Sequence, residues 1–474
     1  AKCSHVSRSN AHRQPVPVGA GVATVTEMLF LLACAGPSKD GTDDTAPTAD
    51  DTATESTPID SDSAPPIDVT FSELTITEDP LLSTTLTISW TTDPATVGYL
   101  EYGDSTAYGD ESVEESKAST SHSVTIPRLG AGAEWHFRAH GDGATSADAT
   151  YTIAVPDWLP GIEMDGDAAE LDGYLLLPLN GTVYGVAIVD PKGRYVWWRE
   201  VPDGFFAPRA LLTRDGTSIA YAEVGEESYG PDGRMVFAPL DGSDATTMDV
   251  PYLSHDFVEL PDGTWACITK DIQHNYVGDR IVEYYTDGTH EVVWSAFNYF
   301  NWKNYEVTDG TWTHANALRY DEDEDAWYLS LRNFDTLLKA DRSSRTITWR
   351  LTTSSSNFDY VDGAIPTVHQ HGFELLGDNH ILVFDNREEE PSRVVEYELD
   401  ETANEVREAW SYTNAADTYV YALGNPKRLD GDRTLINWAT DGSVQIIDSD
   451  GTELWSLRAD LGVIFGYAEV LSLD

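Results

Sequence analysis

Short runs in which apolar and polar side chains alternate occupy the chain between residues 67 and 156. Residues 84–90, 98–102 and 122–126 are the clearest of these runs, and Gly, Asp and Pro turn signals separate them. Alternation with a period of two is typical of strands that bury one face. The pattern therefore predicts a small β-sandwich over residues 67–156.

From about residue 170 onward a longer pattern repeats roughly every 50 residues, a period within the range of propeller blades. A copy consists of a strand, an Asp/Gly turn and a second strand that usually ends in Trp, and another hairpin precedes it. The six copies begin at Val186, Met235, Ile281, Leu337, Val394 and Val444. This repeat predicts a six-bladed β-propeller over residues 157–474, so the whole fold is expected to be all-β.

The last strand-like run, residues 468–473, has no partner of its own. Pairing it with residues 174–177 would close the ring and protect the edge strands. The sequence therefore predicts that the two ends of the propeller region meet in one sheet.

Three histidines stand at the same point of three successive copies. His255, His314 and His371 each open the run that is expected to line the central channel. Rotational pseudosymmetry brings equivalent positions to one height around one axis. The three imidazoles are therefore predicted to share a central pocket, and Arg209 and Asn425 lie near the same position in two other copies.

These residues alone leave more than one function open. Three convergent histidines suit a transition metal, because imidazole is a good ligand for Zn and Cu. A metal-binding propeller hydrolase is therefore one alternative to a metal-free enzyme. A non-catalytic propeller that is tethered at the cell envelope and binds ligands is another.

The charge of the chain narrows the choice of partners. Its 81 Asp and Glu residues face 29 Lys and Arg residues, which gives a formal net charge of −52. Such a surface repels nucleic acid and anionic lipid, so neither is expected as a partner. The three cysteines, Cys3, Cys34 and Cys267, are too few for a disulfide framework.

The N-terminal region resembles a bacterial lipoprotein. Leu31-Leu32-Ala33-Cys34 is similar to a lipobox, so residues 1–34 are interpreted as a signal segment with Cys34 as the lipidated residue. Residues 35–66 are almost all Asp, Thr, Ser, Pro, Ala and Gly, a composition typical of an acidic disordered linker. We expect a location at the cell envelope, as a periplasmic or surface lipoprotein, or secretion. The lipid is the only membrane contact expected.

Two features make the expected sandwich similar to a fibronectin type III domain. Trp90 lies in an early strand, where that family has its core tryptophan. Leu129–Arg138 resembles the family's leucine-turn-aromatic corner, with Trp135 in place of the usual tyrosine. No chemistry is assigned to this domain.

The propeller region resembles the bacterial arylsulfate sulfotransferases over about residues 170–474. The resemblance rests on four motifs that occur in the family's order, namely Trp-x-His-x-Asn, Ser-x-Arg, Gln-His and Phe-Asp-Asn. Here they are Trp312-Thr313-His314-Ala315-Asn316, Ser330-Leu331-Arg332, Gln370-His371 and Phe384-Asp385-Asn386. The family has a β-sandwich beside a six-bladed propeller.

The resemblance implies transfer of a sulfuryl group from a phenolic sulfate donor to a phenolic acceptor, with no nucleotide or other cofactor and no metal. His371 matches the family nucleophile, which forms a sulfohistidine. His255 and His314 match the flanking histidines, and Arg332 matches the family arginine. The chain departs from the family in two ways, since Cys267 has no disulfide partner and the sandwich looks like a fibronectin module.

Further residues are expected to support this site. Asn316 and Asn333 are candidate hydrogen-bond partners of the histidines and the arginine, and Asp385 and Asn386 are expected to hold the pocket geometry. Arg209 is a candidate substrate-binding residue. A rival nucleophile is His369, because residues two apart on a strand face the same side. The site residues predicted from the sequence are therefore His371, His255, His314, Arg332, Asn316, Asn333, Asp385, Asn386, Arg209, the rival His369 and the lipidation site Cys34.

Overall fold

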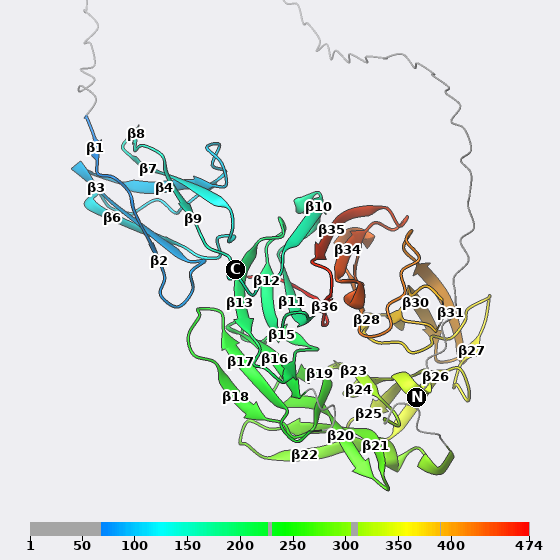
Figure 1. Ribbon diagram of the computed structural model, residues 1–474. Helices are drawn as coiled ribbons and strands as arrows, with labels where there is room; N and C mark the ends of the chain where they lie inside the picture. Colours follow the sequence, from blue (N-terminus) through cyan, green and yellow to red (C-terminus); the bar gives the residue numbers. More distant parts are fainter. Residues whose placement is uncertain (1–67, 226–229, 305–310, 389, 474) are drawn as a thin grey trace, which may run out of the picture. The chain divides into compact units, whose positions relative to one another are not determined.

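The computed structural model describes residues 68–225, 230–304, 311–388 and 390–473. The expected signal segment, Cys34 and the acidic linker lie outside the described residues, so those predictions stay untested. Residues 67–474 belong to one compact unit. Figure 1 shows that this unit is built of strands, and the prediction of an all-β fold is confirmed.

The first strands form two antiparallel sheets that enclose a small core. One sheet contains β1 (Thr70–Phe71), β2 (Thr75–Glu78), β3 (Leu86–Thr96) and β6 (Ser119–Ile126). The other contains β4 (Gly98–Gly103), β5 (Asp110–Glu111), β7 (Glu134–Gly141), β8 (Ala144–Thr145) and β9 (Ala149–Thr152). Trp90 and Phe137 are buried in this core. The indole of Trp135 donates a hydrogen bond to Gly130 O at 2.9 Å, and the fibronectin resemblance itself stays a prediction.

Six sheets follow in the described residues. The first sheet contains β11 (Tyr174–Gly181), β12 (Gly185–Val189), β13 (Tyr195–Glu200), β36 (Val463–Phe465) and β37 (Glu469–Leu471). The second sheet contains β14 (Phe205–Phe206), β15 (Ala210–Leu212), β16 (Ser218–Gly225), β17 (Arg234–Pro239) and β18 (Thr246–Asp249). The third sheet contains β19 (Leu253–Glu259), β20 (Trp265–Gln273), β21 (Tyr276–Tyr284) and β22 (His290–Ser295). The fourth sheet contains β23 (Ala315–Asp321), β24 (Ala326–Leu331), β25 (Thr336–Asp341) and β26 (Ile347–Thr352). The fifth sheet contains β27 (Asp359–Tyr360), β28 (Phe373–Gly377), β29 (His380–Asp385), β30 (Arg393–Asp400) and β31 (Glu405–Tyr412). The sixth sheet contains β10 (Ile162–Gly166), β32 (Asn425–Arg428), β33 (Thr434–Asn437), β34 (Ser443–Ile447) and β35 (Glu453–Ala459).

The six sheets lie around a common axis. The first strands of neighbouring sheets contact one another, as β19 does β23, β23 does β28 and β28 does β32. In Figure 1 the sheets follow one another around the ring from green through yellow to red. This is the arrangement of a propeller. The only helices among the described residues are short 3-10 turns, η1 (Ala168–Glu170), η2 (Ala296–Asn298), η3 (Trp302–Asn304), η4 (Arg332–Phe334), η5 (Asp430–Asp432) and η6 (Ala439–Asp441).

The ring is closed at two places. β37 pairs with β11 through Tyr174 and Leu471, Leu175 and Val470, and Leu176 and Glu469, so the predicted pairing of the two ends is confirmed. In addition, β10 pairs with β35 at the outer edge of the last sheet. This second closure was not predicted from the sequence, because β10 lies before the first recognised repeat.

The recurring tryptophans explain the repeat. The indole of Trp455, in the last sheet, donates to Pro191 O in the Asp/Gly turn of the first sheet at 2.9 Å. Three further indoles make the equivalent bond to the turn of the next sheet, from Trp197 to Pro239, from Trp349 to Glu401 and from Trp410 to Ser449. The Trp and the Asp/Gly turn recur together because they meet between two sheets, where four of the indoles bond across the gap.

The sandwich packs directly on the first propeller sheet. Thr84 Oγ1 donates to Val196 O at 2.6 Å. The guanidinium of Arg194 lies 5.0 Å from the centre of the Trp135 ring and also bonds Asp104 at 3.0 Å. These contacts join the two parts of the unit.

Candidate active site

The three predicted histidines lie where the first strands of three neighbouring sheets begin. His255 is inside β19, His314 directly precedes β23, and His371 lies two residues before β28. The pairing register shifts between Leu253 and Phe257 in β19 and again at the start of β23. Such bulges redirect side chains and are common beside active sites.

His255 and His314 are in direct contact. Their ring centres lie 4.9 Å apart. His255 Nδ1 is 2.8 Å from Ser254 Oγ, and His314 Nδ1 is 3.1 Å from Thr311 Oγ1. Each ring therefore shares a hydrogen bond with a nearby hydroxyl group, that of Ser254 for His255 and that of Thr311 for His314.

Electrostatics place the other predicted groups around this pair. Burial lowers the pKa of His255 well below its ordinary value, and positive charge on His314, Lys270, His371 and Arg332 lowers that pKa further. Charges affect a pKa in this way only when the groups lie close together. The structure thus brings the three histidines and Arg332 into one site.

His371 is held by an asparagine whose orientation is fixed. His371 Nδ1 lies 2.7 Å from Asn386 Oδ1 and 3.2 Å from His369 O. Asn386 Nδ2 donates to Val420 O at 2.8 Å and to Leu423 O at 3.0 Å. These two carbonyl groups require the amide nitrogen, so the amide oxygen must face the imidazole.

The protonation of His371 follows from these contacts. Both partners of Nδ1 are acceptors, so Nδ1 carries the ring proton and Nε2 is left as the basic nitrogen. Burial lowers the pKa of His371 to about 3, and His314 and Arg332 lower it as well, while the bond to Asn386 opposes the shift. The ring is therefore neutral around pH 7.

Arg332 begins η4, directly after β24. Its backbone N–H donates to His314 O at 3.0 Å, which ties the arginine to the flanking histidine. Its guanidinium donates to Asn333 Oδ1 at 3.0 Å, and Asn333 Nδ2 donates in turn to Thr311 O at 3.0 Å. Asn333 thus links the guanidinium of Arg332 to the backbone of Thr311.

Asn316 supports His371 through the backbone. Asn316 Nδ2 donates to Gln370 O at 2.8 Å. The side chain of Gln370 donates to Ser330 Oγ at 3.1 Å and to Thr336 O at 3.1 Å. The Gln-His motif therefore joins the nucleophile candidate to the neighbouring sheet, which also carries Arg332.

Asp385 is structural. Its Oδ1 accepts the N–H of Val368 at 2.8 Å and its Oδ2 accepts Nε of Arg393 at 2.9 Å. Burial raises the pKa of Asp385. Its two oxygens thus bond the backbone of Val368 and the side chain of Arg393.

Arg209 lies in a different cluster. It pairs with Asp256 at 3.1 Å and with Glu469, and its guanidinium is 5.9 Å from the ring centre of Tyr467. Among the described residues no contact joins Arg209 to the histidines. Arg209 lies in the gap between β14 and β15, which both pair with β16, so the register argument does not extend to the second sheet. Arg209 lines a separate cavity of about 290 Å³ together with Asn425.

His369 is not placed like a second nucleophile. It lies outside β28 and has a left-handed backbone, with φ of 54°. Its N–H donates to Asp335 Oδ1 at 2.8 Å, and its carbonyl accepts from His371. The two-residue alternation that made it a rival applies only to regular strands.

Two buried charged residues beside the histidines, Lys270 and Asp279, were not predicted from the sequence. They form an ion pair of 2.9 Å. A signal was present, because Thr269-Lys270-Asp271 interrupts an otherwise apolar run in β20. Their target could not be read from the sequence, since Asp279 bonds residues more than thirty positions away.

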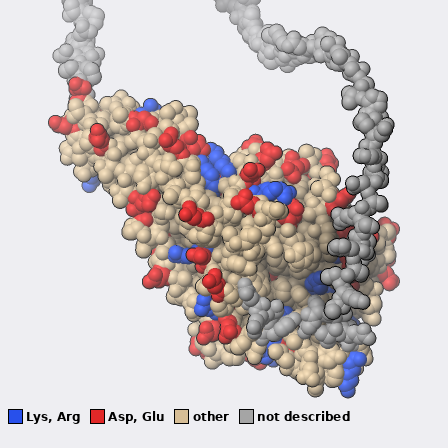
Figure 2. Space-filling view, in the orientation of Figure 1, with Lys and Arg blue, Asp and Glu red and all other residues tan. Residues whose placement is uncertain are grey.

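Neither a metal-binding cluster nor a membrane-spanning helix is found among the described residues. No cluster of three or more His, Cys, Asp or Glu side chains among them has the spacing to hold a metal ion, so the geometry gives no support to the metal-site alternative. Within the part of the chain that the structure describes, no helix is long and apolar enough to cross a membrane. Figure 2 shows Asp and Glu side chains scattered over the visible face.

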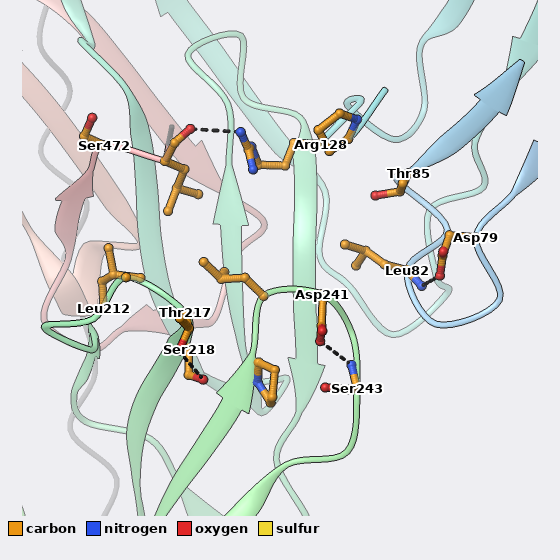
Figure 3. A pocket seen from close by; sticks show the side chains of 15 residues that line it. Asp79, Leu82, Thr85, Arg128, Leu212, Thr217, Ser218, Asp241, Ser243 and Ser472 are labelled. Carbon is orange, nitrogen blue, oxygen red and sulfur yellow. Dashed lines mark hydrogen bonds between the residues drawn. The ribbon is translucent and has the colours of Figure 1, made fainter. Parts of the chain in front are cut away.

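A cavity of about 840 Å³ lies where the sandwich meets the first sheets (Figure 3). Leu82, Leu212 and Leu240 contribute its apolar wall. Arg128 crosses one side and donates to Leu473 O at 2.9 Å. None of the predicted site residues lines this cavity.

Comparison with known proteins identifies the propeller region. The family model described as arylsulfotransferase (ASST) matches residues 179–455, more than half of the chain. No curated protein matches the chain. Similar solved structures include a protein of unknown function from Bacteroides caccae (16% identity, 63% of this chain and 98% of that chain, TM-score 0.43), TolB from Acinetobacter baumannii (14%, 72% and 81%, 0.39) and a periplasmic gluconolactonase from Pseudomonas aeruginosa (12%, 80% and 100%, 0.38).

Proposed function

Because the chain belongs to the arylsulfotransferase family, we propose that it transfers a sulfuryl group from a phenolic sulfate ester to a phenolic acceptor. His371 carries the group between the two phenols as a sulfohistidine. No nucleotide or other cofactor takes part. Donor and acceptor then react in turn, which gives ping-pong kinetics.

The observation that carries this proposal is the state of His371. Its Nδ1–H is bonded to Asn386 Oδ1 at 2.7 Å and to His369 O at 3.2 Å, which leaves Nε2 as the nucleophilic atom. An imidazole attacks only in its neutral form. Burial holds the pKa of His371 at about 3, so the reactive form predominates near pH 7.

In the first half-reaction, Nε2 of His371 attacks the sulfur atom of the donor in line with the bond to the phenol oxygen. The N–S bond forms as the S–O bond breaks, and the electron pair leaves with the phenolate. Sulfuryl transfer resembles phosphoryl transfer in its loose transition state, whose equatorial oxygens need cationic donors. Arg332 supplies a fork of such N–H donors.

The flanking histidines act on the phenol oxygen. The pKa of His255 is lowered well below its ordinary value by burial and by nearby cations, so this ring is neutral and contributes a hydrogen bond rather than a proton. In the second half-reaction the acceptor oxygen attacks sulfur, the N–S bond breaks, and Nε2 of His371 recovers its electron pair. His314 accepts the proton of the acceptor phenol in this scheme.

We also propose that this chemistry takes place at the cell envelope or outside it, with the chain held by a lipid on Cys34. The resemblance of residues 31–34 to a lipobox supports this location, and the net charge of −52 speaks against nucleic-acid partners. The change Cys34→Ala should move the protein from the membrane fraction of cells to the soluble fraction. Membrane retention of that variant would contradict the proposed anchor.

The direct test is release of nitrophenol from p-nitrophenyl sulfate by the full chain, with and without added phenol. We expect release that requires the acceptor and disappears in His371→Ala. The matched control is His380→Ala, which removes a histidine that bonds Glu396 at 2.6 Å outside the site. Near-normal release by His371→Ala would refute the proposed nucleophile.

Two other outcomes separate the alternatives. Release that is independent of an acceptor points to a hydrolase. No release from any aryl sulfate by a folded protein refutes the transferase and favours the ligand-binding propeller. Trapping the sulfuryl group on the protein after a short reaction, and its loss in His371→Ala, identifies the intermediate by mass.

A further inference from the structure

His314 has an unusual backbone conformation. Its φ is 50°, in the left-handed region that a residue with a side chain seldom adopts. Such a residue persists only where its surroundings over-determine it, and these positions cluster at functional sites. The ring that results stands 4.9 Å from His255.

One carboxylate oxygen holds both neighbours of His314. Asp279 Oδ2 accepts the hydroxyl of Thr313 at 2.6 Å and the backbone N–H of Ala315 at 2.7 Å. All three of these residues are buried. Asp279 therefore clamps the chain immediately before and immediately after the left-handed residue.

The other oxygen of Asp279 is held by Lys270. Nζ of Lys270 lies 2.9 Å from Asp279 Oδ1, and the two residues face each other across β20 and β21. A buried carboxylate requires such a partner, because an unpaired charge in the interior is strongly unfavourable. Lys270 also donates its backbone N–H to Tyr252 O at 2.9 Å, directly before the strand that carries His255.

The ion pair thus links the two flanking histidines. Lys270 fixes the start of β19, Asp279 fixes the turn before β23, and the two are bonded to each other. We propose that Lys270 and Asp279 are positioning residues that hold His314 in its left-handed conformation, with its ring against His255. The inference rests on the proposed sulfuryl transfer, in which His314 acts on the phenol.

The proposal predicts that Asp279 acts through His314. The change Asp279→Asn keeps the size of the side chain and removes its charge, so the clamp and the ion pair weaken together. We expect kcat with p-nitrophenyl sulfate to fall roughly 10-fold to 100-fold while KM changes little, because a misplaced catalytic group affects mainly the transition state. In a His314→Ala background the same change should have almost no further effect.

The matched control is Asp271→Asn, one residue from Lys270 in β20. Asp271 is also buried, but its carboxylate bonds Ser295 at 2.6 Å and does not reach the His314 turn. We expect its effect on kcat to be the same with and without His314. If Asp279→Asn fails to fold, Thr313→Val removes one of the two clamp bonds and leaves the ion pair intact; it should show the same dependence on His314.

A second readout does not need activity. In protein with ¹³C-labelled histidine rings, the His314 signal is assigned by its loss in His314→Gln. Asp279→Asn should shift this signal and leave that of His380 unchanged. Equal loss of kcat in both His314 backgrounds, or an unmoved His314 signal, would overturn the positioning role. Absence of turnover in the unmodified protein would refute the proposed function, while the ring signal would still decide the inference.

Discussion

The depressed pKa of His371 makes the stability of the fold depend on pH, and His371→Gln should remove part of that dependence. His371 is buried, and burial lowers its pKa from 6.5 to about 3. Glutamine is of similar size and does not titrate. The change therefore isolates the contribution of this one ring.

The sign follows from proton binding. Between pH 3 and pH 6.5 the unfolded chain binds a proton at this position and the folded chain does not. Stability is therefore complete above pH 6.5 and falls as the pH drops toward 3. At ~1.4 kcal/mol per pH unit, the change from pH 7 to pH 5 should cost about 2 kcal/mol of unfolding free energy from this group.

The assay is urea unfolding followed by tryptophan fluorescence, at pH 7 and at pH 5, for the unmodified protein and for His371→Gln. The unmodified protein should lose about 2 kcal/mol more than the variant between the two pH values. His255 also has a lowered pKa, chiefly from burial, and this effect of burial is common to both proteins. An identical pH dependence in the two proteins would refute a neutral, buried His371.

Three further predictions concern single bonds. Asn386→Leu removes the acceptor of the His371 Nδ1–H, and kcat for p-nitrophenyl sulfate should fall about 10-fold to 100-fold, since a buried donor that loses its partner costs ~1–3 kcal/mol. Arg332→Lys keeps the charge but loses the fork, so kcat should drop at least about 10-fold, whereas Arg345→Lys on the surface should match the unmodified protein. Trp455→Phe removes the bond to Pro191, and chemical denaturation should show a loss of about 1–2 kcal/mol.

The repeat of the fold was readable from the sequence because its signals are local. Each copy contains two strands and a turn within a short stretch, and in five of the six copies a Trp lies in the second strand. The pairing of Tyr174–Leu176 with the C-terminal strand was predictable because that strand had no partner in its own repeat. The pairing of β10 was not, since residues 162–166 carry no repeat signal and gain their partner only when the ring closes.

The site was partly readable for the same reason. Equal register predicted that His255, His314 and His371 converge, and their contacts and electrostatics agree with it. Equal register did not bring Arg209 to the histidines, because its strand is interrupted and its guanidinium pairs with Asp256 and Glu469. The register of the repeats also did not predict the role of Asp279, because its bond runs from the third strand of one sheet to the first strand of the next.

In the proposed mechanism, the reactivity of His371 depends on which acceptor bonds its Nδ1–H. In a chain with 81 acidic residues, the described partners of His371 Nδ1 are an amide oxygen and a backbone carbonyl, and that of His255 is a hydroxyl. A carboxylate at Nδ1 would favour the imidazolium and raise the pKa. An amide fixes the same tautomer without adding charge, so burial and Arg332 can keep Nε2 unprotonated. Buried acidic residues such as Asp279 pair with cations, and this separation suits the proposed role of His371 as a nucleophile in so acidic a protein.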